Sequence, residues 1–440
     1  MAVDLLIVYN QVMALMMNVW SWILSFIPIV KPLVPAAADV HRCVEIPGPG
    51  GLDQLKVLAL KGQITCGYNI PGFKSPYTPV GVNGENIPAD CIILCNEAFS
   101  INYADVTIRW GLYESALRFV GWPIVPGFDV AGTVEHAGPD SGFKAGDKVY
   151  GCSMFGAYSS RVLVPGRQLR LRPNGVDAEA AAALPAVCGT ALHALYLAGF
   201  WPNPPLTANK AVLIHSAAGG VGSMLVQMAK LCGCSPVVAV VGSAHKVQAC
   251  RDLGADAVID KSAGADLWAA ALAASPQGKG FAAVFDANGV ATLADSFKAL
   301  DRCGRLVVYG FHTNLPRGGS HLLSPWEWGK MAVGMFRMPA FDPMQMTLES
   351  KAVLGFNLSF FADEVAVIKA YLAQVDEWVV SKELKLPNTV VFEMDKIGEA
   401  HRLIQSGQSV GKIVVRTRAT PGLAVDRGDG PEGAKGVKRE

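Results

Sequence analysis

The chain has 440 residues, enough for two or three domains with large hydrophobic cores. Its 38 basic and 37 acidic residues give a formal net charge of +1, so the basic excess typical of a nucleic-acid-binding protein is absent. Hydrophobic residues make up 51% of the chain, which excludes a wholly disordered protein. None of the ten cysteines falls in a Cys-x-x-Cys pair, and this favours a reducing compartment.

An uncharged segment of 26 residues, 5–30, opens the chain between Asp4 and Lys31. As a helix it would be about 39 Å long, more than the roughly 30 Å hydrocarbon thickness of a bilayer. It lacks the basic start of a secretory signal peptide, and its polar residues fall in one sector of the helix. We expect residues 1–40 to form a hydrophobic helix and a linker. A membrane-spanning anchor with the main body facing the cytoplasm, an interfacial helix, and targeting or intramolecular packing remain open.

Residues 41–166 carry short β-branched runs broken by Gly and Pro, which predicts a compact, mainly β domain. Between residues 167 and 355, short apolar strands alternate with helical segments. This alternation predicts an α/β fold with a parallel sheet covered by helices on both faces. Residues 356–417 return to mixed character, and the charged, Gly-rich tail 418–440 is expected to be disordered.

The most informative segment is a strand–turn–helix pattern at residues 210–233. Its turn consists of Ala217, Ala218, Gly219, Gly220, Val221 and Gly222. Glycines at such a turn let the backbone approach a pyrophosphate, which then lies at the positive N-terminus of the helix. Ala217 replaces the first glycine of the usual pattern, so the prediction of a dinucleotide site depends on the strand–turn–helix context. A tight turn without a cofactor is the alternative.

The next strand ends in Gly242 and Ser243, followed by Lys246, with no carboxylate nearby. An NAD site usually has Asp or Glu at this point to bind the ribose 2′-hydroxyl. A small residue, a hydroxyl and a cation suit a 2′-phosphate instead. The sequence therefore favours NADPH over NADH, the alternative being that Lys246 is a solvated lysine in a first helical turn.

Eight segments in the same order carry a family resemblance: NYADVTIRWGLY (102–113), PGFDVAGTVEHAG (126–138), GDKVYG (146–151), AALPAVCGTALHALY (182–196), SAAGGVG (216–222), LGADAVID (253–260), GRLVVYG (304–310) and VGKIVV (410–415). They resemble the medium-chain dehydrogenase/reductase superfamily, in particular its zinc-free quinone oxidoreductase branch. Within that branch, FNLSFF (356–361) and GFHTNLPRGG (310–319) are similar to the vesicle amine transport protein homologues.

The resemblance implies a GroES-like substrate domain, a Rossmann cofactor domain and a cleft between them. Carried over by motif, it implies a set of cofactor-binding residues: Thr190 facing the nicotinamide, Gly219, Gly220, Val221 and Gly222 at the pyrophosphate, Ser243 and Lys246 at the 2′-phosphate, Tyr309, Gly310 and Phe311 beside the nicotinamide ribose, and Asn357 and Lys412 at further contacts. Relatives often have Asn-Tyr where this chain has Asp260 and Lys261. Lys261 could replace the tyrosine, whereas Asp260 would oppose the phosphate.

Zinc alcohol dehydrogenases of the superfamily use a Cys where this chain has Asn102 and a His where it has Phe128. The closely spaced cysteines of their structural zinc lobe are also missing, so we expect no metal. Alcohol oxidation would lack the Lewis acid that stabilises an alkoxide, whereas quinones and enones delocalise the negative charge that hydride transfer brings. We therefore expect hydride transfer from NADPH to a quinone or activated enone. Asn102 could bind the acceptor oxygen and Tyr113 could donate a proton; a turn-stabilising amide and a rim tyrosine are the alternatives.

An apolar insertion at about 311–351 is rich in Trp, Met and Phe. Flexible thioethers and aromatic rings suit adaptable apolar contacts, including phospholipid or a partner surface. The resemblance to the vesicle amine transport protein homologues implies a phospholipid-binding or membrane-contact role as well. The alternative function is therefore a membrane-associated lipid-binding or trafficking protein that binds NADPH with little turnover. A dimer interface, in an expected homodimer, or a lid over the substrate pocket would also explain the insertion.

Overall fold

The computed structural model describes residues 40–417, except 62, 69, 71–75, 80–86, 204–208, 265, 315–324 and 361–363. The predicted N-terminal helix and the predicted disordered tail both lie outside the described residues. Within the described ranges, no helix is both long and apolar enough to cross a membrane.

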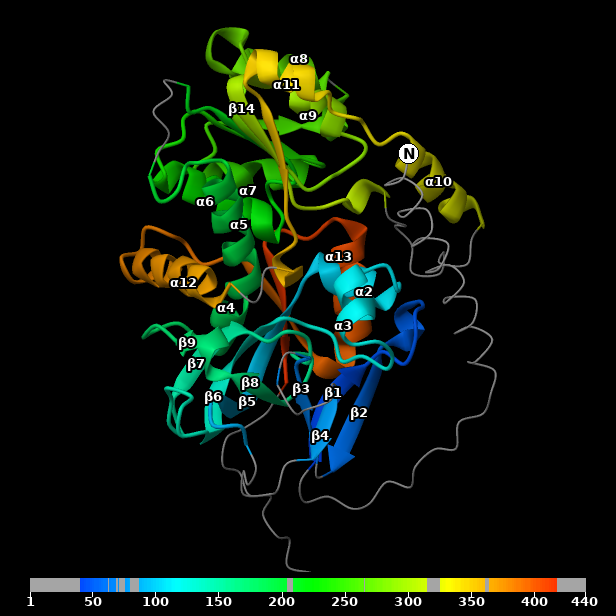
Figure 1. Ribbon diagram of the computed structural model, residues 1–440, viewed down its shortest axis with the longest axis vertical. Coiled ribbons are helices and arrows are strands. Elements are labelled where there is room, and N and C mark those ends of the chain that lie inside the picture. The colour runs from blue at the N-terminus through cyan, green and yellow to red at the C-terminus, as the bar shows by residue number, and fades with distance from the viewer. Residues whose placement is uncertain are drawn as a thin grey trace, which may run out of the picture.

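The lower half of the molecule in Figure 1 is built on a mostly antiparallel sheet. Nine of the described strands form it: β3 (Gln63–Cys66), β4 (Tyr77–Pro79), β5 (Cys91–Ile101), β6 (Asp129–Ala137), β7 (Lys148–Cys152), β8 (Arg161–Pro165), β9 (Leu169–Leu171), β16 (Thr389–Glu393) and β17 (Lys412–Arg416). A separate hairpin joins β1 (Val40–Glu45) to β2 (Lys56–Lys61). Most residues of β5 are buried because it pairs with β6, β8 and β17. The C-terminal strand thereby joins the centre of a sheet built mainly by residues 63–171.

Three helices pack beside this sheet: α2 (Tyr103–Arg109), α3 (Glu114–Phe119) and α13 (Ile397–Ser406). The asparagine before α2 acts as its N-cap, and the Asp105 side chain returns to the Asn102 backbone to complete a capping box. A capping box satisfies two backbone N–H groups that a helix start otherwise leaves without partners. The sequence Asn-x-x-Asp thus places Asn102 at a sharply defined helix start.

The upper half is a parallel sheet in the strand order β12-β11-β10-β13-β14-β15. Its strands are β10 (Val212–Ile214), β11 (Val237–Val241), β12 (Ala257–Asp260), β13 (Phe281–Asp286), β14 (Leu300–Val308) and β15 (Ala352–Gly355). This is the order of doubly wound dinucleotide-binding sheets, and it reverses between β10 and β13. The predicted α/β fold with a parallel sheet is confirmed.

Both faces of the parallel sheet are buried, as its apolar strands predict. Alternate residues of β10 and β11 point to opposite cores: Val212 and Ile214 to one, Leu213 to the other. The first core is covered by α5 (Pro185–Leu197), α6 (Gly220–Leu231) and α7 (Val247–Asp252). The second is covered by α8 (Leu267–Ala274), α9 (Leu293–Lys298) and α11 (Pro343–Glu349).

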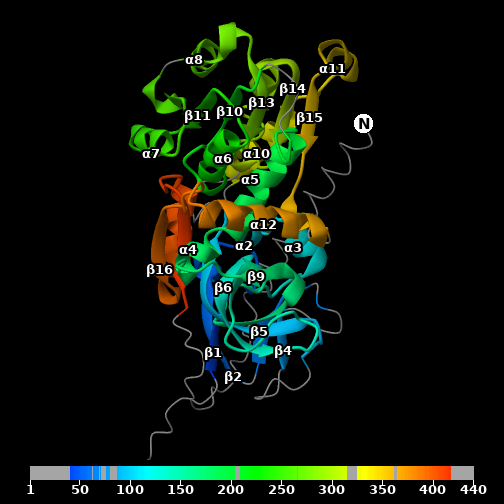
Figure 2. The ribbon, with the colours of Figure 1, turned by 90° about the vertical axis from the view of Figure 1, so that its left-hand side faces the viewer.

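The two halves share a continuous apolar core through α4 (Ala178–Ala182), α5 and α12 (Val365–Val380). Figure 2 shows α12 lying across the junction. Polar contacts tie α12 to the lower sheet, because Asp376 accepts hydrogen bonds from Tyr150 on β7 and Arg170 on β9. The insertion forms α10 (Pro325–Phe336) and α11, and α10 projects from the side of the molecule.

The turn between β10 and α6 leaves no room for a side chain at its last glycine. A Cβ atom on Gly222 would lie 2.4 Å from the carbonyl oxygen of Ser216 and 2.7 Å from Cα of Ala217. Gly398, in the first turn of α13, has nothing within 4 Å of its Cβ position. The two positions are a matched pair, since both glycines lie in the first turn of a helix.

We predict that Gly222→Ala lowers the free energy of unfolding by about 1–3 kcal/mol, because the backbone must shift to admit the methyl group. Gly398→Ala should leave stability unchanged or raise it by up to about 1 kcal/mol, as alanine does in an open helix. Thermal unfolding without added cofactor measures both. Equal melting temperatures for the two variants would contradict this account of the turn.

Candidate functional site

Polar side chains gather at the carboxyl ends of β10 and β13, where the strand order reverses. Ser216 Oγ donates to Asn288 Oδ1 at 3.0 Å, and His312 Nε2 lies 3.4 Å from Ser216 Oγ. Behind them, the fully buried Asp286 accepts four hydrogen bonds, from the Asn288 and Gly289 backbone N–H groups and the Thr292 and Ser296 hydroxyls. In open α/β sheets, ligands bind in the crevice at this reversal point.

The four predicted pyrophosphate residues open α6 beside this crevice. A Cβ atom on Gly220 would lie 3.0 Å from Cδ of Lys412 and 3.0 Å from a Val187 methyl group. The Gly411 N–H also donates to the Ala218 carbonyl at 2.9 Å. The glycine turn therefore lies against the start of β17, and the predicted contact residue Lys412 reaches it from the other sheet. A twelve-residue helix that starts at a glycine-rich turn fits a pyrophosphate.

The predicted 2′-phosphate residues lie at the end of β11, across the glycine turn from β13. Ser243 precedes a short 3-10 turn, Ala244–Lys246, and Lys246 Nζ donates to the Gly407 carbonyl. Burial lowers the pKa of Lys246, and the nearby charge of Lys261 lowers it further. The Lys261 side chain also approaches Gly242: a Cβ atom on Gly242 would lie 3.5 Å from Cε of Lys261. Two cations therefore flank the point where a 2′-phosphate is expected.

Asp260, which the sequence analysis expects to oppose a phosphate, forms hydrogen bonds within its own turn. Its Oδ1 accepts hydrogen bonds from the Ser262 backbone N–H at 2.9 Å and the Ser262 hydroxyl at 2.7 Å. These bonds lower the pKa of the carboxyl group, and it stays ionised as the cap of the turn Lys261–Ala263. The carboxylate thus has its own hydrogen-bond donors.

The predicted nicotinamide residues lie at the ends of β14 and β15 and on α5. The Phe356 N–H donates to the Val308 carbonyl at 3.3 Å, and the Tyr309 and Phe356 rings lie 6.4 Å apart. This pairing places Tyr309 beside Phe356, the residue before Asn357, whereas Phe311 packs against Gly289. Thr190 lies on α5, directly after Gly189. A Cβ atom on Gly189 would lie 3.5 Å from Cδ2 of Leu358. The structure thus gathers the predicted nicotinamide contacts from three separate segments.

Tyr113 belongs to a hydroxyl cluster that joins α3 to the segment after β15. Its hydroxyl donates to Asn357 Oδ1 at 3.1 Å and lies 2.8 Å from Ser359 Oγ. Ser115 Oγ donates to Ser359 Oγ at 3.1 Å. Burial raises the pKa of Tyr113, while the bonds to Ser359 and Asn357 oppose the rise. The sequence analysis did not single out Ser115 or Ser359, and the only signal for Ser359 is its place in the FNLSFF segment.

Asn102 lies at the centre of a buried charged network. Its Nδ2 donates to Asp129 Oδ2 at 2.8 Å, and its Oδ1 accepts from Lys412 Nζ at 2.7 Å. A lysine only donates and a carboxylate only accepts, so these two partners fix which way the amide points. One N–H of the Asn102 amide remains beyond the bond to Asp129.

Lys412 and Asp129 are nearly inaccessible to solvent, at 2% and 0% exposure. Lys412 Nζ lies 3.6 Å from Asp129 Oδ2 and also donates to the Ile101 carbonyl at 3.0 Å. Burial lowers the pKa of Lys412 below its usual value, and the charges of Asp129 and Asp105 oppose this shift only in part. Asp129 also accepts from the Ala186 N–H on α5 and from the Ser100 hydroxyl. The sequence analysis did not single out Asp129, because nothing local to it shows that it meets Lys412 and Asn102.

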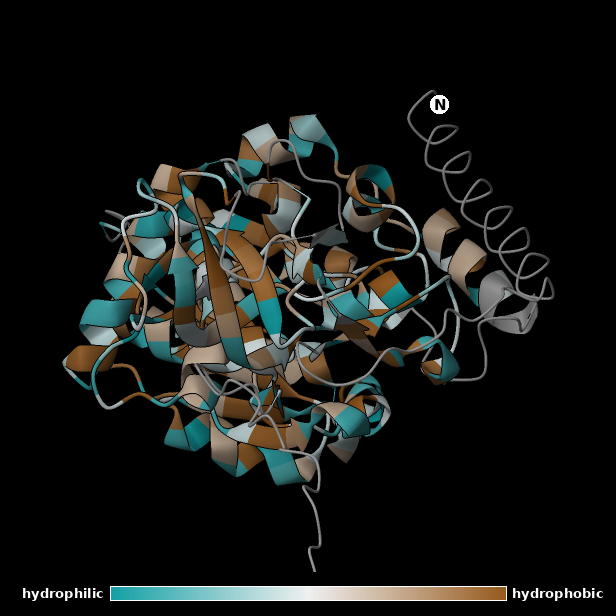
Figure 3. Cartoon of the chain, turned by 90° about the horizontal axis from the view of Figure 1, so that it is seen from below, coloured by the Kyte–Doolittle hydropathy of each residue, from teal (hydrophilic) through white to brown (hydrophobic). Residues whose placement is uncertain are grey.

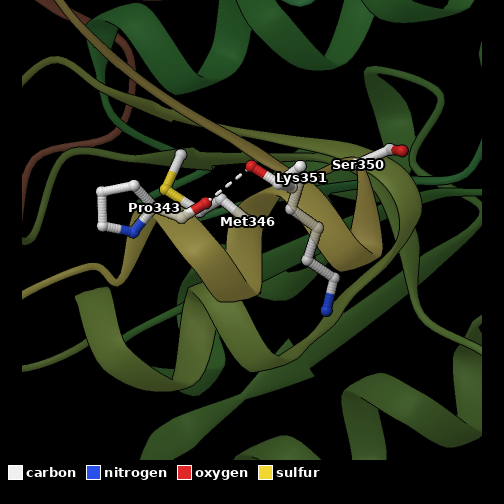
Figure 4. Close-up of a pocket in the computed structure, with 5 residues that line it drawn as sticks. Pro343, Met346, Ser350 and Lys351 are labelled. Atoms are coloured by element: carbon white, nitrogen blue, oxygen red, sulfur yellow. Dashed lines mark hydrogen bonds between the residues drawn. The ribbon is translucent and has the colours of Figure 1, made fainter.

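Within the part of the chain that the structure describes, no group of three or more His, Cys, Asp or Glu side chains could hold a metal ion. A separate open hollow of about 580 Å³ lies beside α11 and is lined by Pro343, Met346, Thr347, Ser350 and Lys351 (Figure 4). All five residues come from one short segment of the insertion. The hollow therefore contains none of the strand-end residues of the crevice.

Two family models match the chain: an alcohol dehydrogenase GroES-like domain over residues 88–174, and a zinc-binding dehydrogenase over residues 220–372. The first match covers β5 to β9 of the antiparallel sheet, and the second covers β11 to β15 of the parallel sheet. The chain therefore belongs to the medium-chain dehydrogenase/reductase superfamily, with a GroES-like and a Rossmann part.

Within the superfamily, the human synaptic vesicle membrane protein VAT-1 homolog is 28% identical over 379 residues, 85% of this chain and 86% of that protein. A probable quinone oxidoreductase of Schizosaccharomyces pombe is 26% identical over 74% of this chain and 88% of its own length. The crystal structure of Escherichia coli quinone oxidoreductase complexed with NADPH has a TM-score of 0.66 at 22% identity, covering 86% of this chain and all of that one. The chain is thus similar both to vesicle membrane proteins and to quinone oxidoreductases.

A pH-dependent stability follows from Asp105, which is fully buried and accepts the Asn102 N–H at 2.8 Å. Burial raises the pKa of its carboxyl from 3.8 to about 7. Between these values the folded protein holds a proton that the unfolded chain has lost, so the free energy of unfolding falls as pH rises from about 4 to 7.

We predict that Asp105→Asn removes this pH-dependent part of the free energy of unfolding, which amounts to about 4 kcal/mol at most. The unfolding free energy of the wild type should therefore decline more steeply between pH 4.5 and 7.5 than that of the variant. Urea denaturation at both pH values measures the difference. Parallel pH dependences for the two proteins would show that Asp105 is ionised throughout this range.

Proposed function

We propose that the protein is an oxidoreductase that uses NADPH to reduce a quinone or an activated enone without a metal ion. One observation carries the proposal: Lys412 contacts both the glycine turn of α6 and the Asn102 amide. The likeness to quinone oxidoreductases supports the same reaction class. The quinone or enone acceptor and the absence of a metal are the parts of the proposal that experiment must decide.

The residues of the crevice fit NADPH along its length. The side-chain-free turn at Gly220 and Gly222 would hold the pyrophosphate, and Ser243 with Lys246 and Lys261 would hold the 2′-phosphate. Thr190, Tyr309, Gly310, Phe311 and Asn357 would border the nicotinamide and its ribose. When bound, NADPH supplies the hydride; the protein supplies orientation and hydrogen bonds.

Asn102 would bind the acceptor oxygen through its remaining amide N–H. The buried ammonium of Lys412 on Oδ1 polarises the amide, which strengthens a hydrogen bond given by its nitrogen. Such a donor stabilises negative charge as it develops on the substrate oxygen. Proton donation by Tyr113 stays a prediction, and it would require the hydroxyl to turn away from Asn357.

Lys246→Ala tests the cofactor assignment. We predict that the dissociation constant for NADPH rises about 10- to 100-fold, because a charge-assisted hydrogen bond to the phosphate contributes about 1.5–3 kcal/mol. The constant for NADH should change less than about threefold. Lys298→Ala, which removes an exposed lysine paired with Asp295 on α9, is the control. Cofactor fluorescence titration of the wild type and both variants measures the constants for the two cofactors, and equal losses of NADPH and NADH binding in Lys246→Ala would disprove the 2′-phosphate role.

Turnover tests the reaction. The purified full-length protein should oxidise NADPH faster than NADH when an ortho-quinone or an enone is added. Chelators should leave the rate unchanged if no metal takes part. NADPH binding without turnover on either acceptor class would reject the reductase and leave the second candidate.

A second candidate, lipid or membrane binding, is favoured by one surface. The insertion exposes large apolar side chains on α10 and α11: Val333 at 49%, Phe336 at 84%, Met344 at 71% and Leu348 at 81%. Figure 3 shows apolar residues on the projecting helix. Such side chains suit a membrane surface or the second copy of a homodimer. Sedimentation with phospholipid vesicles, for the full chain and after deletion of residues 1–38, separates binding by this surface from binding by the N-terminal segment.

A further inference from the structure

His312 lies where the two halves of the molecule meet at the crevice. It begins the turn His312–Asn314, directly after the segment that borders the nicotinamide side. Its Nε2 is 3.4 Å from Ser216 Oγ at the end of β10, and its ring centroid is 5.8 Å from that of Tyr103 on α2. The half-buried imidazole therefore lies between the parallel sheet and the helix that Asn102 caps.

The loop after β13 holds this imidazole in place. The His312 N–H donates to the Ala287 carbonyl at 3.4 Å, and both the backbone N–H and the hydroxyl of Thr313 donate to the Asn288 carbonyl, at 3.1 and 2.6 Å. Asn288 in turn is held by Asp286. These bonds tie the backbone at His312 and Thr313 to the loop after β13.

The proposed reaction needs a proton that the other groups are poorly placed to give. The Asn102 amide does not ionise, and the one proton of the Tyr113 hydroxyl is directed to Asn357. Lys412 Nζ is buried and bonded to Ile101 and Asn102. An imidazole can act both as a proton donor and as a proton acceptor in general acid–base catalysis.

We propose that His312 is the general acid of this reaction, an inference that rests on the reductase function proposed above. As hydride forms a C–H bond at the β-carbon of an enone, the C=C electron pair moves toward the carbonyl and negative charge develops on oxygen. The Nε2–H bond of the imidazolium breaks and its proton goes to that oxygen; water then returns a proton to the neutral imidazole. The Ser216 contact, at 3.4 Å, is long for a hydrogen bond.

The test compares His312→Ala with His312→Gln in the full-length protein. General acid catalysis typically contributes about 10²- to 10⁴-fold, so kcat for enone reduction should fall by about 100-fold or more in both variants. The dissociation constant for NADPH, from fluorescence titration, should stay within about threefold. Added imidazole should restore turnover in His312→Ala in a saturable way, because it can occupy the space left by the ring. It should not rescue His312→Gln, where that space is filled.

His136→Ala is the control, since His136 lies on β6 opposite Ile93 in the antiparallel sheet. Its kcat should equal that of the wild type, with no response to imidazole. Unchanged kcat in His312→Ala, or a loss that imidazole does not restore, overturns the role of His312 while wild-type turnover leaves the reductase function standing. Absence of turnover in the wild type overturns both.

Discussion

The site depends on one buried charge, the ammonium of Lys412. An ion removed from water must be compensated by nearby opposite charge and hydrogen bonds, or the fold loses several kcal/mol. Here Asp129, Asn102 and the Ile101 carbonyl provide that compensation. The three partners come from β6, the start of α2 and the end of β5. The hydrogen bonds and the ion pair of this one lysine therefore fix β17 relative to two neighbouring strands and to α2.

The same lysine connects the two halves. Its aliphatic stem packs against Gly220 at the start of α6, and its neighbour Gly411 bonds to Ala218 in the same turn. Asp129 also accepts a hydrogen bond from the Ala186 N–H in the first turn of α5. The glycine turn that we propose for the cofactor and the Asn102 amide are therefore connected by short contacts around a buried ion pair.

The crevice also explains why the predicted site residues come from scattered positions. Ends of parallel strands meet at one edge of the sheet, so Ser216, Asp286 and Tyr309 become neighbours. The antiparallel half contributes Asn102 and Tyr113 through the helices that follow β5. Apolar residues exposed on α10 and α11 lie outside this arrangement, which leaves the insertion available for another contact.

Much of this architecture could be predicted from the sequence. The alternation of apolar strands and helices indicated a parallel sheet, and the glycine turn indicated where a dinucleotide binds, because periodicity and steric room are local properties of the chain. The network around Asn102 could not be predicted, since Lys412 lies 310 residues away and nothing local shows which buried acid it meets.

The sequence by itself determined the types of elements, the glycine turn and the set of segments that build the crevice. Only the tertiary structure decided the partners: that the Asn102 amide is fixed by Lys412 and Asp129, that the Tyr113 hydroxyl meets Ser359, and that His312 approaches Tyr103. The physical reason is that backbone sterics and hydrophobic period act within a few residues. The pairing of polar side chains depends instead on how whole sheets pack against each other.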